Sequence, residues 1–163
     1  MNRIEAKSMA EALIAEHGLT CSFEFDRHKM RMGSCRFFDN VPLVITLSGP
    51  LVDLNSIELV RDIILHEIAH AKVGPQANHD WRWRTVAQSI GCTSTTCVDP
   101  KVVRVPGKYR AVCPGCGKVW YAYKTPKRNG SSSCGDCGHG VFNAAFALYF
   151  VPNFTLDTLY SVR

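Results

Sequence analysis

Two pairs of cysteines place the tightest constraint on how the C-terminal part of this 163-residue chain can fold. Cys113 and Cys116 form one Cys-x-x-Cys pair, and Cys134 and Cys137 form a second pair after a spacer of 17 residues. Pairs at this spacing are typical of a zinc site in which each turn points two thiolates at one metal ion. Four thiolates leave no open coordination position, so the pattern predicts a structural zinc ion that stabilises a small module.

A second set of metal-ligating side chains lies in a stretch with the pattern of a buried helix. Apolar residues form stripes on two adjacent helical faces between a cap expected at Asn55 and a break at Gly74. His66, Glu67 and His70 form a His-Glu-x-x-His motif there, and residues four apart share one face of a helix. Two imidazoles so placed can bind one zinc ion, while Glu67 faces a water beside it. The alternative is two histidines that share a helical face without a metal.

A catalytic zinc site needs a third protein ligand, and the sequence offers several candidates. No glutamate follows Glu67, which excludes the zinc peptidases that use a downstream glutamate. Gln76 stands where the metzincin pattern has its third histidine, so that class is excluded too. His79 lies nine residues after His70, and a new helix beyond the glycine–proline break could bring it back over the first one. His79 is therefore the preferred ligand, and the remaining candidates are Asp80, Asp99, Asp136, Asp157 and His139.

Periodicity along the rest of the chain predicts an α+β fold. We expect the first two strands to pair, Asn55 and Glu58 to form a capping box, and residues 92–112 to be irregular. The sequence KVWYAYK is expected to form a hairpin within the spacer between the cysteine pairs. We divide the chain into a domain over residues 1–100 and a module over residues 101–163. The helices are expected over 3–17, 55–73 and 79–90, and the strands over 20–26, 28–38, 41–48 and 141–151.

The formal net charge of +5 is unevenly distributed along the chain. Residues 1–100 carry a net charge of −2, whereas residues 101–140 carry +7. Such a basic segment favours an anionic partner, and the alternative is a solubilising surface. Aromatic and basic side chains interleave there, as in proteins that bind single-stranded nucleic acid by base stacking and phosphate contacts, although the tyrosines could instead pack the module. The predicted contacts are Lys118, Tyr121, Tyr123, Lys124, Lys127 and Arg128.

In combination, these motifs resemble the SprT-like (Spartan-type) zinc metallopeptidases. The family has His-Gly-x-x-Phe/Trp after its HExxH motif, and here the corresponding stretch is His79-Asp80-Trp81-Arg82-Trp83, with Asp in place of Gly. Upstream, MGSCRFFDNVPLVITLS is similar to the family's Gly-x-Cys and Ile-x-Leu-Ser stretch. The resemblance covers roughly residues 4–150. It implies a zincin-like α+β domain, with helices and a small antiparallel sheet, followed by a zinc ribbon.

The motifs and the resemblance together predict a zinc endopeptidase with one catalytic and one structural zinc ion. Zinc acidifies a water and polarises the scissile carbonyl, and Glu67 passes the water's proton to the leaving amine. The resemblance implies substrates that are proteins on DNA or crosslinked to DNA. The alternative is a non-catalytic, zinc-stabilised nucleic-acid-binding or regulatory protein, in which the histidines hold only a structural metal. Glu67 disfavours this alternative, because a structural site has no need of it.

Composition predicts a soluble protein that is not bound to a membrane, with 46% hydrophobic and 20% charged residues. No apolar run approaches the ~18 residues of a membrane span, and the N-terminal stretch lacks the apolar core of a signal peptide. We expect an intracellular monomer, either cytoplasmic or associated with the nucleoid or nucleus through DNA. Reduced thiols are the rule there, which disfavours disulfides between the cysteine pairs. Cys21 and Cys35 are expected to be buried on strands, and Cys92 and Cys97 are not expected to form a metal site.

Overall fold

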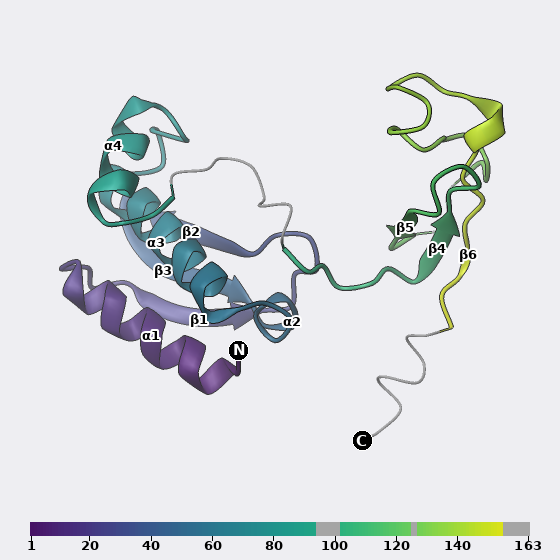
Figure 1. Ribbon diagram of the computed structural model, residues 1–163. Coiled ribbons are helices and arrows are strands. Elements are labelled where there is room, and N and C mark those ends of the chain that lie inside the picture. Colours follow the sequence, from purple (N-terminus) through teal and green to yellow (C-terminus); the bar gives the residue numbers. More distant parts are fainter. Residues whose placement is uncertain (94–101, 125–126, 155–163) are drawn as a thin grey trace. The chain divides into compact units, whose positions relative to one another are not determined.

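The computed structural model describes residues 1–93, 102–124 and 127–154. Two compact units make up the chain, Met1–Val105 and Pro106–Arg163 (Figure 1). Cys97, Asp99 and Asp157 lie outside the described residues.

The first unit packs helices against a three-stranded sheet whose strand order is β1-β3-β2. Helices α1 and α3 lie side by side along the sheet (Figure 1). The unit therefore has the α+β organisation expected from the sequence. Its elements are α1 (Arg3–Glu16), β1 (Ser22–Asp26), β2 (Gly33–Phe38), β3 (Val41–Ser48), α2 (Gly49–Val52), α3 (Ile57–Val73) and α4 (Trp81–Ser89).

Strand β3 occupies the centre of this sheet because it is the most apolar strand. Its residues 44–48 are all buried. Strand β1 pairs with it in parallel and β2 pairs with it antiparallel, so the sheet is mixed rather than purely antiparallel. The expected direct pairing of the first two strands is wrong, since each of them covers one side of β3 instead. A continuous apolar strand gains most from neighbours on both edges and both faces.

A hydrophobic core lies between the sheet and the helices of the first unit. Helix α3 contributes Val60, Ile64, Leu65 and Ile68 to it, and each is fully buried. Cys21 is buried next to β1, as expected, whereas Cys35 on β2 is half-buried. None of the described helices is long and apolar enough to cross a membrane.

Side-chain caps fix where the helices start. Ser56 caps α3 by accepting the N–H of Leu59 at 3.4 Å, so the capping box expected at Asn55 is wrong. Asn55 is 5% exposed and binds a distant backbone segment instead. Its Nδ2 donates to the Val103 carbonyl at 2.9 Å, and its Oδ1 accepts the N–H of Val103 at 2.8 Å. Asp80 caps α4, which therefore begins two residues later than expected.

The second unit is built on a small sheet with strand order β5-β4-β6. Its elements are β4 (Tyr109–Val112), β5 (Val119–Ala122), the 3₁₀ helix η1 (Ala144–Phe146) and β6 (Val151–Pro152). Strands β4 and β5 form a hairpin around the first cysteine pair. The hairpin expected within the spacer is therefore wrong, because KVWYAYK supplies the second arm of a hairpin that starts before Cys113. Residues 109–112 are also more regular than expected.

The continuous strand expected over residues 141–151 is also wrong. The side chain of Asn143 accepts the N–H of Ala145 at 2.9 Å and starts η1 at this point. Local side-chain capping therefore overrides the apolar alternation of the sequence. The core of this unit is small, and its buried members are Ala111, Cys113, Cys134 and Leu148.

Candidate functional site

Three histidines converge at one end of α3. His66 and His70 lie one turn apart on this helix, and His79 lies in the turn before α4. Their Nε2 atoms form a triangle with sides of 3.3 Å between His66 and His70, 3.1 Å between His70 and His79, and 3.1 Å between His79 and His66. Tetrahedral coordination with Zn–N bonds of about 2.0 Å separates the ligand atoms by roughly 3.3 Å. The triangle therefore fits a single zinc ion.

The turn between α3 and α4 brings His79 back to the helix. Gly74 ends α3 with a φ of 85°, in the left-handed region that favours glycine. Asp80, which stands where the family pattern has glycine, accepts the N–H groups of Arg82 at 2.9 Å and Trp83 at 3.3 Å. Of the alternative third ligands, Asp80 is thus used as a helix cap, and Asp136 forms an ion pair with Lys118 at 2.7 Å.

Trp83 packs against all three imidazoles. Its ring centroid lies 4.6 Å from those of His66 and His79 and 5.3 Å from that of His70. Trp83 is fully buried, and its indole N–H has no hydrogen-bond partner among the described residues. We did not assign this residue to the site from sequence, although its position four residues after His79, within the helix expected over 79–90, was a usable signal.

Burial prepares these imidazoles to bind a cation. Burial, followed by the proximity of His70 and His79, lowers the pKa of His66 to about 4. Burial and the proximity of His79 likewise lower the pKa of His70 to about 4. The pKa of His79 is lowered, again mainly by burial. All three rings are therefore neutral at neutral pH, which is the form that ligates a metal.

Glu67 lies between α3 and β2 and is only 6% exposed. Burial raises the pKa of its carboxyl group to about 8, while the positive charge of Arg31 and a backbone hydrogen bond from Cys35 oppose this rise. The cluster of donor atoms close enough to hold one metal ion here consists of the three histidines and does not include Glu67. Glu67 is thus a buried carboxyl group adjacent in sequence to a ligand candidate, but outside the ligand cluster.

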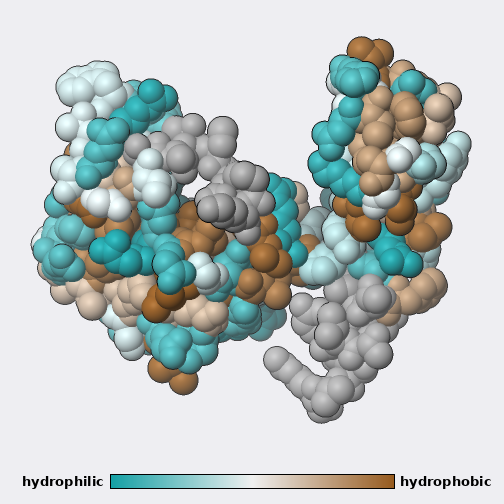
Figure 2. Space-filling view, in the orientation of Figure 1, coloured by the Kyte–Doolittle hydropathy of each residue, from teal (hydrophilic) through white to brown (hydrophobic). Residues whose placement is uncertain are grey.

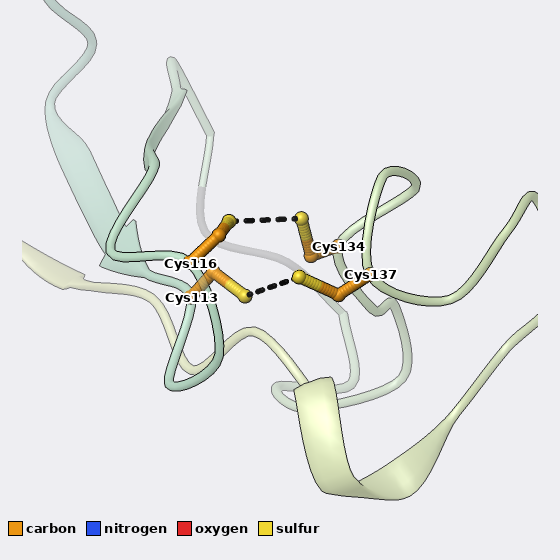
Figure 3. A group of neighbouring side chains, drawn as sticks. All are labelled: Cys113, Cys116, Cys134 and Cys137. Carbon is orange, nitrogen blue, oxygen red and sulfur yellow. Dashed lines mark hydrogen bonds between the residues drawn. The ribbon is translucent and has the colours of Figure 1, made fainter.

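The four cysteines of the second unit form a separate cluster (Figure 3). The Sγ atoms of Cys113 and Cys137 lie 3.8 Å apart, and those of Cys116 and Cys134 lie 3.7 Å apart. Tetrahedral coordination with Zn–S bonds of about 2.3 Å separates the sulfurs by roughly 3.8 Å. These distances fit a zinc ion and are far too long for a disulfide, whose S–S bond is about 2.0 Å.

The first unit matches a known protein family. The SprT-like family model matches residues 5–103. The chain belongs to the SprT-like family. The predicted resemblance is thereby confirmed for the first unit.

Solved structures and curated proteins were also compared with this SprT-like chain. The crystal structure of the metallopeptidase zymogen jannalysin from Methanocaldococcus jannaschii is similar, with 21% identity and a TM-score of 0.44. That match covers 52% of this chain and 79% of jannalysin. No curated protein matches the chain.

The residues predicted to bind nucleic acid lie on the second unit of this SprT-like chain. Tyr121 is half-exposed at 49%, and Tyr123 is partly buried. Lys118 forms the ion pair with Asp136 and also lies 5.1 Å from the centre of the Trp120 ring. The remaining three, Lys124, Lys127 and Arg128, are exposed.

The sequence did not lead us to include Arg110 among the residues predicted to bind nucleic acid. Arg110 is exposed and pairs directly with Tyr121 across β4 and β5. The next cross-strand pair on this face is Val112 with Val119, so a basic, an aromatic and two aliphatic side chains share one exposed face. In Figure 2 the visible face of this unit likewise mixes hydrophobic and hydrophilic residues. The alternation within YRAV could have identified Arg110, had the strand been recognised.

Proposed function

We propose that this SprT-like protein is a zinc-dependent metallopeptidase that cleaves peptide bonds within proteins. The observation that carries this proposal is the triangle of three neutral imidazoles next to a buried glutamate. A structural metal site gains nothing from burying a carboxyl group beside its ligands, because burial of a charge is costly. A shifted pKa at such a position is instead a common feature of catalytic groups.

In this proposal, His66, His70 and His79 would hold a zinc ion. Zinc bound there would supply a Lewis acid, which would polarise a peptide carbonyl and make a water easier to deprotonate. Glu67 takes the proton from this water and delivers it to the nitrogen of the leaving amine. Burial suits Glu67 to this role, since a carboxylate with raised proton affinity can hold the proton between the two transfers. Trp83 excludes water from one side of the imidazoles and fixes their orientation.

Replacing Glu67 with glutamine tests this mechanism. The amide is nearly the same size as the carboxyl group but cannot accept the proton, so hydrolysis of a protein substrate should fall by roughly 10²–10⁴-fold. Folding and zinc content should be unchanged. If the Glu67→Gln variant keeps wild-type activity, Glu67 is not the general base and this mechanism is wrong. If the wild type itself hydrolyses no protein substrate, the rival function gains support, namely a non-catalytic, zinc-stabilised nucleic-acid-binding or regulatory protein.

We further propose that the cysteine cluster holds a second, structural zinc ion and that its unit binds DNA. Residues 101–140 carry +7 in the absence of metal. A zinc ion with four thiolates contributes about −2, which leaves the segment at roughly +5. The pairing of Arg110 with Tyr121 on an exposed sheet face supports contacts with both phosphates and bases. Protein substrates bound or crosslinked to DNA would then be concentrated at the protease, with single strands preferred.

Two further proposals follow from the chemistry of the chain. We propose an intracellular location, because the thiols of the cysteine cluster must stay reduced to bind zinc. We also propose that the protein acts as a monomer, since a single chain supplies both complete ligand sets. Sedimentation of the purified protein at several concentrations tests the second of these proposals.

A further inference from the structure

Gly33 meets the side chain of Glu67 where β2 passes α3. A Cβ atom built on Gly33 would lie 2.9 Å from Oε1 of Glu67 and 3.0 Å from its Cγ. Atoms in van der Waals contact ordinarily stay about 3.5–4.0 Å apart. The carboxyl group of Glu67 therefore packs directly on the backbone of β2, in space that any other residue would fill.

Backbone conformation does not explain the glycine at this position. Gly74 and Gly117 have positive φ values of 85° and 72°, which side chains rarely adopt, but Gly33 is outside this region. Gly33 lies in a regular strand, where glycine costs stability and often marks a close approach by another group. The absence of a side chain is what this position requires.

The surroundings of Gly33 leave little room for adjustment. Leu47, its cross-strand partner, is 1% exposed, and its Cδ2 would lie 3.0 Å from the added Cβ. The adjacent carbonyl of Met32 accepts the N–H of the buried Ser48 at 2.8 Å, which holds this end of β2 against β3. An added methyl group would therefore displace Glu67 rather than the strand.

We propose that Gly33 is a positioning residue for Glu67, because its bare backbone determines where the carboxyl group lies relative to the three histidines. Strand β2 thus provides a steric limit for this side chain. The inference rests on the proposed function, in which Glu67 is the general base.

The expected consequence of Gly33→Ala is a catalytic defect without loss of the metal. Restoring normal contacts requires Glu67 to move by roughly half an ångström, and a displacement of about 1 Å can cost 10²-fold in rate. We expect kcat to fall by roughly 10-fold or more. The KM for a protein substrate and the zinc content should stay within about twofold of wild type, because the histidines do not change.

Gly49 offers a matched control within the same unit. A Cβ on Gly49 would lie 2.8 Å from Cζ of Arg3, so Gly49→Ala introduces the same kind of crowding away from Glu67. Both variants should be measured for kcat, KM, zinc content and Tm. The proposal predicts that kcat falls in Gly33→Ala but not in Gly49→Ala. Equal kcat values in Gly33→Ala and the wild type, or equal losses in the two variants, would overturn it.

A folding measurement covers the case in which Gly33→Ala is too unstable to assay. Glu67→Ala removes both Oε1 and Cγ, so the Tm loss caused by Gly33→Ala should be smaller in that background. If Gly33→Ala lowers the Tm equally in the wild type and in Glu67→Ala, or prevents folding in both, the crowding involves Leu47 rather than Glu67. Either result would overturn the proposal. The Glu67→Gln variant separates the two ideas. If it is inactive while Gly33→Ala is fully active, the proposed function stands and only the role of Gly33 is wrong.

Discussion

The two ligand clusters of this SprT-like protein are held in opposite ways. The histidines belong to a unit with an extensive apolar core, in which α3 alone buries Val60, Ile64, Leu65 and Ile68. The cysteines belong to a unit whose core consists of Ala111, Leu148 and two of the cysteines themselves. From this contrast we expect the first unit to fold without a metal at its histidines, and the second unit to need a metal at its cysteines in order to fold.

The largest expected effect is therefore the loss of a cysteine. Cys134→Ser should unfold the second unit, because zinc binding contributes roughly 10–16 kcal/mol of apparent free energy in small zinc modules. The first unit should remain folded. Limited proteolysis with mass spectrometry would locate the cleavages, which we expect beyond Val105, and zinc analysis should show one ion in place of two. A second unit that stays protected would show that its core is sufficient.

Loss of a histidine should have the complementary effect. His79→Ala removes one of three ligands, so hydrolysis should fall by at least about 10³-fold, and one of two zinc ions should be lost. In zinc-free buffer, the Tm of the first unit should differ little between His79→Ala and the wild type, because its core does not depend on the ligand. His17→Ala, an exchange of a histidine outside the cluster, is the matched control. A His79→Ala variant with full zinc content and activity would show that the third ligand lies elsewhere.

These ligand sets were predictable because they are local patterns. HExxH needs only the period of one helix, and the Cys-x-x-Cys pairs need only two turns, so spacing alone indicated these residues as ligands. His79 lies outside the motif and was the preferred one of several candidates. The α+β class followed from periodicity in the same way. By contrast, the central place of β3 depends on the competition between strands for a common core. The helix η1 replaced an expected strand because a single side chain, that of Asn143, caps it.

Contacts between distant residues were outside the reach of sequence reasoning. Asn55 has the residue type and the sequence setting of a helix cap, and its hydrogen bonds to Val103, 48 residues away, could not be read from the sequence. Gly33 likewise has no sequence signal beyond its motif, because its role depends on the distance to Glu67. Both examples involve one side chain whose partner is fixed by the tertiary fold.

Two buried asparagines allow the units to be compared by equivalent substitutions. Asn55 holds Val103 in the first unit, and Asn153 donates to the carbonyl of Gly107 at 3.0 Å in the second. Each is 5% exposed. Replacing either with alanine leaves buried backbone groups without a partner, which costs about 1–3 kcal/mol.

We expect Asn55→Ala to lower the Tm of the first unit by roughly 10 °C. Asn153→Ala should lower the stability of the second unit alone, and less so in excess zinc, because the metal supplies most of its stability. Hydrogen exchange, which reports on each unit separately, is the suitable measurement. Equal sensitivity of both variants to zinc would contradict the contrast between the units.

The smallest expected effect concerns the charges of the second unit. Lys124, Lys127 and Arg128 are exposed, and if they contact phosphates their removal should weaken binding of single-stranded DNA by roughly 10-fold near 0.1 M salt. The slope of log affinity against log salt should become shallower by about 2, since each contact with a single strand contributes about 0.7. Titration of labelled single- and double-stranded DNA at several salt concentrations measures both quantities.

A variant with Lys7, Arg27 and Arg61 replaced by alanine removes the same charge from the first unit and should bind DNA like the wild type. If both triple variants bind DNA equally weakly, only the net charge of the protein matters. If the salt slope is unchanged when Lys124, Lys127 and Arg128 are replaced, these three side chains do not contact phosphates.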